Sequence, residues 1–152
     1  MGEMTLSPLG LYTARPTLRI DGRENQRADT LLLAMDLREQ EGGMSSLALT
    51  FTNWGSREDG SAGPAFEDEQ VFKLGTEIKV YGGEVAGPTE LFRGKVSAIE
   101  LGFDSDGPPR LTLHAEDALA QARLARRIQV YDNQSLADIA REIASRHGLT
   151  PV

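Results

Sequence analysis

The chain has 152 residues, 39% of them hydrophobic, enough to build one ordinary domain or a small domain with part of another. The absence of cysteine excludes a disulfide framework and thiolate metal sites. A net charge of −7 disfavours nucleic acid and anionic lipid as main partners, and no segment approaches the roughly 20 apolar residues that span a bilayer. The start of the chain lacks the basic and apolar regions of a signal peptide, so we expect synthesis in the cytoplasm.

Three alternating segments dominate the first third of the chain. Pro8, Gly10 and the following Pro16 disfavour a helix, so residues 1–15 are expected to form an irregular arm. Period-two patterns predict strands over residues 17–20, 30–39 and 46–52, and Asp21-Gly22 is a turn dipeptide after the first of them. The second and third strands form a predicted hairpin. Its expected buried face consists of Leu31, Leu33, Met35 and Leu37 on one strand and Leu47, Leu49 and Phe51 on the other.

Residues 53–69 are rich in glycine, serine, proline and acidic residues, which is typical of a long surface loop. The loop contains two aromatic residues, Trp54 and Phe66. They either pin the loop to the sheet or contact a partner. Its acidic run at 67–69 is expected to be solvated rather than to bind a cation.

The middle of the chain continues the β pattern. Strands are predicted over 76–81, 91–101 and 110–115, with a turn at 104–109. In the second of these, Val96 and Ala98 share one face, whereas Ile99 and Leu101 follow the other parity. This switch predicts a β-bulge near Ala98. About six strands with hairpin connections favour a small barrel or sandwich.

The pattern changes after residue 116. Asp117 can cap a short helix over 118–125, and residues 126–131 are predicted to form a strand. A second helix starts at a cap on Ser135 and stops at Gly148. Its apolar stripe consists of Leu136, Ile139, Ala140, Ile143 and Ala144. This stripe needs a partner surface, so the helix either packs on the barrel or belongs to a second domain that begins here and is cut short; we favour the second alternative.

No catalytic, cofactor-binding or metal-binding residue is predicted. His114 and His147 are the only side chains expected to titrate near neutral pH, and both occupy positions typical of structural residues. Residues 87–95 end in Gly-Lys but lack the spacing and the hydroxyl residue of a phosphate loop. Residues 104–107 open like a calcium loop, but Pro108 stands at the next ligand position. The chain is therefore not expected to be an enzyme.

The ordered succession of these segments resembles the N-terminal half of phage late control protein D. That family is grouped with the baseplate hub proteins of contractile tails and with the valine–glycine repeat protein G spikes of type VI secretion. The segments that carry the likeness are residues 16–22, 31–38, 111–119 and 135–149, and most firmly Gly75-Thr76-Glu77-Ile78-Lys79-Val80-Tyr81-Gly82 and Leu91-Phe92-Arg93-Gly94-Lys95-Val96-Ser97-Ala98-Ile99.

The resemblance implies a mainly β protein with some helix. It implies a tail-tube-like β-barrel with a short helix over residues 16–125, followed by the start of a mixed α/β domain over residues 126–152. Three hub copies of this kind would form a pseudo-sixfold ring between a hexameric tail tube and a trimeric spike. The implied partners are further copies of the chain, a tail tube protein and a spike protein, without cofactor, in a virion tail or injection particle.

Two segments are candidate ring strands, residues 77–81 and 91–101, because each has one apolar and one mixed face. Together with the loop aromatics they supply the candidate interface residues Trp54, Phe66, Glu77, Lys79, Tyr81, Arg93, Lys95 and Ser97. An alternative reading is a stand-alone binding module, because the helix after residue 131 is similar to the opening of a LysM glycan-binding domain. A LysM domain needs a second helix and a returning strand.

Overall fold

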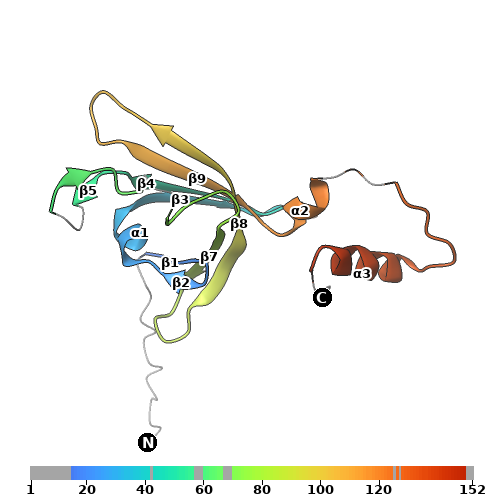
Figure 1. Cartoon of the computed structure of the whole chain (residues 1–152). Helices are drawn as coiled ribbons and strands as arrows, with labels where there is room; N and C mark the ends of the chain where they lie inside the picture. Colours follow the sequence, from blue (N-terminus) through green and yellow to red (C-terminus); the bar gives the residue numbers. More distant parts are fainter. Residues whose placement is uncertain are drawn as a thin grey trace, which may run out of the picture.

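The computed structural model describes residues 15–41, 43–56, 60–66, 70–124, 126 and 128–149. The protein is mainly β, with one seven-stranded antiparallel sheet and three helices in the described residues (Figure 1). Along the sheet the strands follow the order β2 (Arg23–Glu24), β1 (Thr17–Ile20), β7 (Glu77–Gly82), β8 (Thr89–Gly102), β9 (Arg110–Glu116), β4 (Ser46–Thr52) and β3 (Leu32–Arg38). The predicted hairpin of β3 and β4 is confirmed.

The expected barrel is not closed. The two end strands of the sheet, β2 and β3, do not pair with each other. The short helix α1 (Gln26–Leu31) contacts β1 near one end of the sheet and β4 near the other, so it packs across the opening. Ala28 of α1 is fully buried, and the Asp29 Oδ1 accepts a hydrogen bond of 3.0 Å from the Leu18 N–H of β1.

The predicted strand over residues 30–39 is only partly right, because helix α1 occupies its start and a bulge follows. The strand begins at Leu32, and the register shifts between Leu32 and Ala34. Leu33 therefore leaves the expected buried face and is 57% exposed, whereas Met35 and Leu37 still pack against the core. Periodicity alone could not locate this change, because one extra residue reverses the side-chain parity on either side of it.

The core lies between the curled sheet and α1. Its buried side chains include the expected inward residues of β4 and alternate apolar residues of β7, β8 and β9. Three phenylalanines form its densest cluster, with ring centroids of Phe51, Phe66 and Phe72 between 4.9 and 5.6 Å apart. Such tilted and edge-on contacts are favourable aromatic geometries.

The segment after β4 is not entirely irregular. It contains a second, two-stranded sheet of β5 (Gly55–Ser56) and β6 (Ala62–Gly63). The buried Asn53 side chain accepts a hydrogen bond of 2.8 Å from the Phe66 N–H, and this fixes the far end of the loop. Phe66 therefore pins the loop to the core, whereas Trp54 remains 46% exposed. The acidic residues 67–69 lie outside the described part of the chain.

The C-terminal region contains two helices, α2 (Leu119–Arg123) and α3 (Leu136–Arg146). Asp117 accepts hydrogen bonds from the backbone N–H groups of Leu119 and Ser45, so it both starts the turn of α2 and ties it to β4. The predicted strand over 126–131 is wrong: residues 128–131 form no strand, and Ile128 is 97% exposed. A strand needs a partner strand, and none of the described strands pairs with these residues.

Helix α3 is set by local interactions. The Ser135 Oγ accepts from the Asp138 N–H at 3.2 Å, which confirms the predicted cap. At the other end Gly148 has a φ of +67°, and the Leu149 N–H donates to the Ala144 carbonyl oxygen at 2.8 Å. These are the contacts of a Schellman motif. No residue of α3 is buried, and Figure 1 shows it beyond α2, away from the sheet.

Candidate functional site

The eight candidate interface residues fall on two surfaces. Glu77, Lys79, Tyr81, Arg93 and Lys95 lie on the outer face of β7 and β8, because they alternate with buried residues such as Ile78, Val80 and Phe92. The remaining three, Trp54, Phe66 and Ser97, line an apolar groove. The structure therefore separates a charged surface from an apolar one.

The charged surface contains a row of three cations. Arg19, Lys79 and Arg93 lie opposite one another on β1, β7 and β8. Each forms an ion pair with a glutamate: Arg19 with Glu24 at 3.2 Å, Lys79 with Glu77 at 3.0 Å, and Arg93 with Glu90 at 2.8 Å. The row is therefore internally neutralised and offers no free cationic patch.

Glu90 organises one end of this row. It accepts hydrogen bonds from the Arg93 guanidinium and, at 3.0 Å, from the Tyr81 hydroxyl. These donors, Arg93 first, hold the pKa of the Glu90 carboxyl below its usual range, and the same contact raises the pKa of Arg93. The Arg19 guanidinium lies over the Tyr81 ring, 4.8 Å from its centroid. Tyr81 is thus held from both sides.

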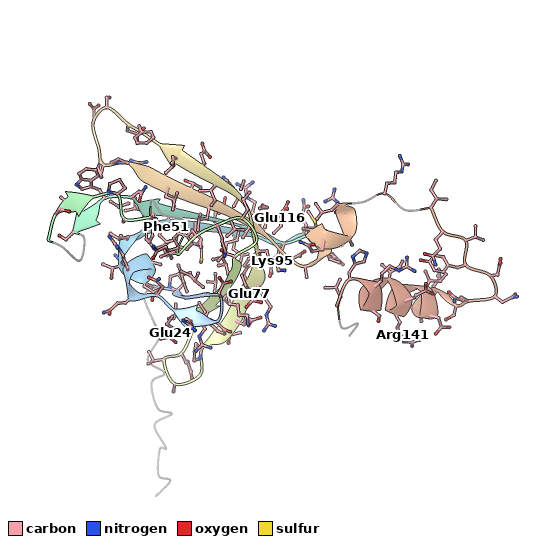
Figure 2. The ribbon with its side chains drawn as sticks, in the orientation of Figure 1. Glu24, Phe51, Glu77, Lys95, Glu116 and Arg141 are labelled. Carbon is pink, nitrogen blue, oxygen red and sulfur yellow. The ribbon has the colours of Figure 1, made fainter. Side chains whose placement is uncertain are left out.

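Lys95 belongs to a second charged row. Its register partners are Glu77 on β7 and Glu116 on β9, and Figure 2 labels all three residues where the sheet approaches α2. Opposite charges placed across neighbouring strands stabilise pairing. Because β7 is paired with β1 on one side and β8 on the other, it offers a partner side chains but no free backbone edge.

The groove has a volume of about 700 Å³. Only three of its residues, Trp54, Phe66 and Ser97, were predicted from the sequence as interface residues. The others that matter most are large apolar side chains that remain exposed: Leu74, Ile99, Leu101 and Phe103. Phe103 is 77% exposed and Leu74 66%. The reversal of parity near Ala98 was the sequence signal that could have identified Ile99 and Leu101.

The bulge in β8 explains how these residues reach the groove. The register shifts between Val96 and Ala98, which confirms the predicted bulge, and the Ser97 Oγ donates to the His114 carbonyl oxygen at 3.3 Å. Ile99 and Leu101 consequently lie opposite the buried Leu113 and Leu111 of β9. Their side chains are therefore on the interior side of the sheet, where they line the groove and remain exposed.

The same part of β8 has one free edge. The last contacts toward β7 are the hydrogen bonds of Val96 with Gly75 (2.8 Å) and Thr76 (2.9 Å). Beyond them, Ala98–Gly102 pairs with β9 only. Figure 1 shows this end of the β8–β9 hairpin projecting beyond the other strands. We call residues Ala98–Gly102 the β8 edge.

Neither histidine lies within a cluster of titratable side chains in the described residues. His114 lies on β9 with its Nε2 3.6 Å from a carboxylate oxygen of Glu100, and His147 follows the last turn of α3. Among the described residues no group of three His, Cys, Asp or Glu side chains is placed to hold a metal ion. In the same residues no helix is long and apolar enough to cross a membrane.

The features that the described residues offer to a partner therefore include the charged rows, the groove and the β8 edge. No protein-family model matches the chain, and no curated protein matches its sequence.

Proposed function

We propose that this chain is a structural component of the baseplate hub of a contractile phage tail or a related injection system, where it adapts a hexameric tail tube to a trimeric spike. The proposal rests on the resemblance to the late control protein D family. It is supported by the mainly β, antiparallel architecture and by the arrangement of the sheet ends. In this role the chain acts by assembly rather than by catalysis.

The observation that carries the proposal is the unclosed sheet. β3 is paired only with β4, so its other side presents unpaired backbone groups at one end of a seven-stranded sheet. Leu33 bulges from this end strand and is 57% exposed. An unpaired edge of this kind is a template for another strand. Copies joined through such edges in a head-to-tail manner form a ring when the rotation closes.

The first test is the solution mass of the full chain, measured by light scattering after size exclusion over a range of concentrations. A trimer or hexamer that forms rings with a central channel in electron micrographs supports the proposal. A monomer at every concentration contradicts self-assembly by this chain.

A pair of matched variants connects the mass to the β3 edge. Leu33→Lys places a charge at the edge, and charged side chains block edge pairing. Val85→Lys makes a comparable change at a residue of similar exposure (52%) in the turn between β7 and β8. We expect the Leu33 variant to dissociate and the Val85 variant to keep the assembly. Equal behaviour of the two variants would contradict a role for the β3 edge.

A further inference from the structure

We infer that the β8 edge and the groove form a strand-addition site for an extended segment of a partner protein, with apolar side chains at alternate positions and lysine or arginine between them. The site needs no ring and no hub, so the inference stands independently of the proposed function. Three properties of the described residues support it: the direction of the backbone groups, the spacing of the apolar side chains and the local charge.

The direction of the backbone groups follows from the pairing of β9 with β4. The Asp117 N–H donates to the Ser45 carbonyl oxygen at 3.1 Å, and this bond sets the phase of the ladder. Bonded and non-bonded pairs alternate along antiparallel strands. Leu111 and Leu113 of β9 therefore direct their N–H and C=O groups toward β4, and the intervening Thr112 directs its groups toward β8.

The same alternation fixes the β8 edge. Glu100, opposite Thr112, is bonded to β9, so Ile99 and Leu101 direct their N–H and C=O groups away from β9. No described strand pairs with them on that side. Two residues at a spacing of two thus offer the donors and acceptors that an added strand uses in β-augmentation.

The side chains of the same two residues point into the groove. Both residues line it, and so do Trp54, Leu74 and Phe103, which are exposed. An added strand places every second side chain on this face. Apolar residues at alternate positions of the partner would therefore cover apolar surface that is open to water in this chain.

The local charge of this chain favours lysine or arginine at the partner positions between the apolar residues. Glu100 lies on the opposite face of the edge, and its side chain is 73% exposed. The turn that follows adds Asp104 and Asp106, and Arg110 lies 3.5 Å from Asp104. Three carboxylates against one guanidinium favour a cationic partner, because opposite charges across neighbouring strands are stabilising and like charges are not.

The experiment uses the full chain and a synthetic peptide of about seven residues that alternates lysine and valine. Trp54 is the only tryptophan in the chain, so its fluorescence reports on the groove directly. We expect a saturable blue shift and slower amide hydrogen exchange at Ile99 and Leu101. A peptide of the same composition with its lysines and valines in separate blocks should cause neither effect. No saturable shift with the alternating peptide, or an equal shift with the block peptide, would overturn the inference.

Variants separate the apolar and the charged contributions. Leu101→Asp should abolish the shift, whereas Val85→Asp, at nearly the same exposure (52% against 53%), should preserve it. Glu100→Lys should weaken binding of the lysine peptide about tenfold and improve binding of a glutamate–valine peptide. Equal binding of both peptides by the unchanged chain would refute the cationic partner. A blue shift that follows protein concentration without peptide, together with a doubled mass, would show a second copy in the groove and would overturn the assignment to a basic partner.

Discussion

Gly94→Ala tests whether β8 and β9 pack as closely as the structure indicates. Gly94 is a buried residue of β8 opposite Ile78. A Cβ atom there would overlap the backbone carbonyl oxygen of Glu116 and lie 2.6 Å from the Phe92 Cζ. The Phe92 ring has some freedom to turn, but the Glu116 backbone is held in β9 between β8 and β4. Relief therefore requires a shift of the strand itself.

Forcing an extra methyl group into a packed interior costs about 1–3 kcal/mol, and we expect the upper half of that range because the obstacle is backbone. For a folding unit of this size, each kcal/mol lowers the Tm by roughly 4 °C. The assay is thermal unfolding followed by circular dichroism. Gly87→Ala is the control, since a Cβ there meets no atom within 4 Å. A Gly94 variant that unfolds within about 0.5 kcal/mol of the control would refute the close packing.

Three further predictions concern α1, the loop pin and α3. Burial raises the pKa of the Asp29 carboxyl above its unfolded-state value. The folded protein therefore loses stability as the pH rises from the unfolded-state pKa of Asp29 through its folded-state pKa. Asp29→Asn should therefore be at least as stable as the unchanged chain at neutral pH in denaturant titrations, whereas Asp29→Ala strands the buried Leu18 N–H and should cost about 1–3 kcal/mol. Phe66→Ala, which removes one ring of the aromatic cluster, should cost about 3–5 kcal/mol and make the loop sensitive to limited proteolysis. Ser135→Ala should speed amide exchange within α3, starting at Asp138, and leave exchange in the sheet unchanged; a change in both would show that α3 and the sheet unfold together.

Much of the β structure was predictable from local pattern. Strand β4 has the predicted bounds and the predicted buried face, because each of its alternate residues is simply apolar or polar. The bulge in β8 was predictable for the same reason, since its two halves carry opposite parity. Leu33 shows the limit of this reasoning. Its apolar side chain fits the periodic pattern, but pairing of its neighbours with β4 leaves it outside the ladder.

The candidate interface was only partly predictable. Sequence pattern selected the outer residues of β7 and β8, and their ion pairs join near neighbours in the sequence. The row of cations and the contact of Arg19 with the Tyr81 ring depend instead on register with β1, which lies far away in the sequence. The groove was missed for the same reason. Its residues come from five separate stretches of the chain, and nothing in the pattern of one stretch indicates that another leaves it uncovered.

Residue order alone determined the features that arise between near neighbours: alternating strands, the Asp21-Gly22 turn, and the caps of α3 at Ser135 and Gly148. Each depends on contacts within a few residues, so the sequence contains the whole interaction. The tertiary structure alone decided the strand order, the unclosed sheet with α1 across its opening, and the absence of a strand over residues 128–131. A strand forms only when a distant segment pairs with it, and a groove stays open only when no distant segment covers it. The packing of the whole core sets both outcomes.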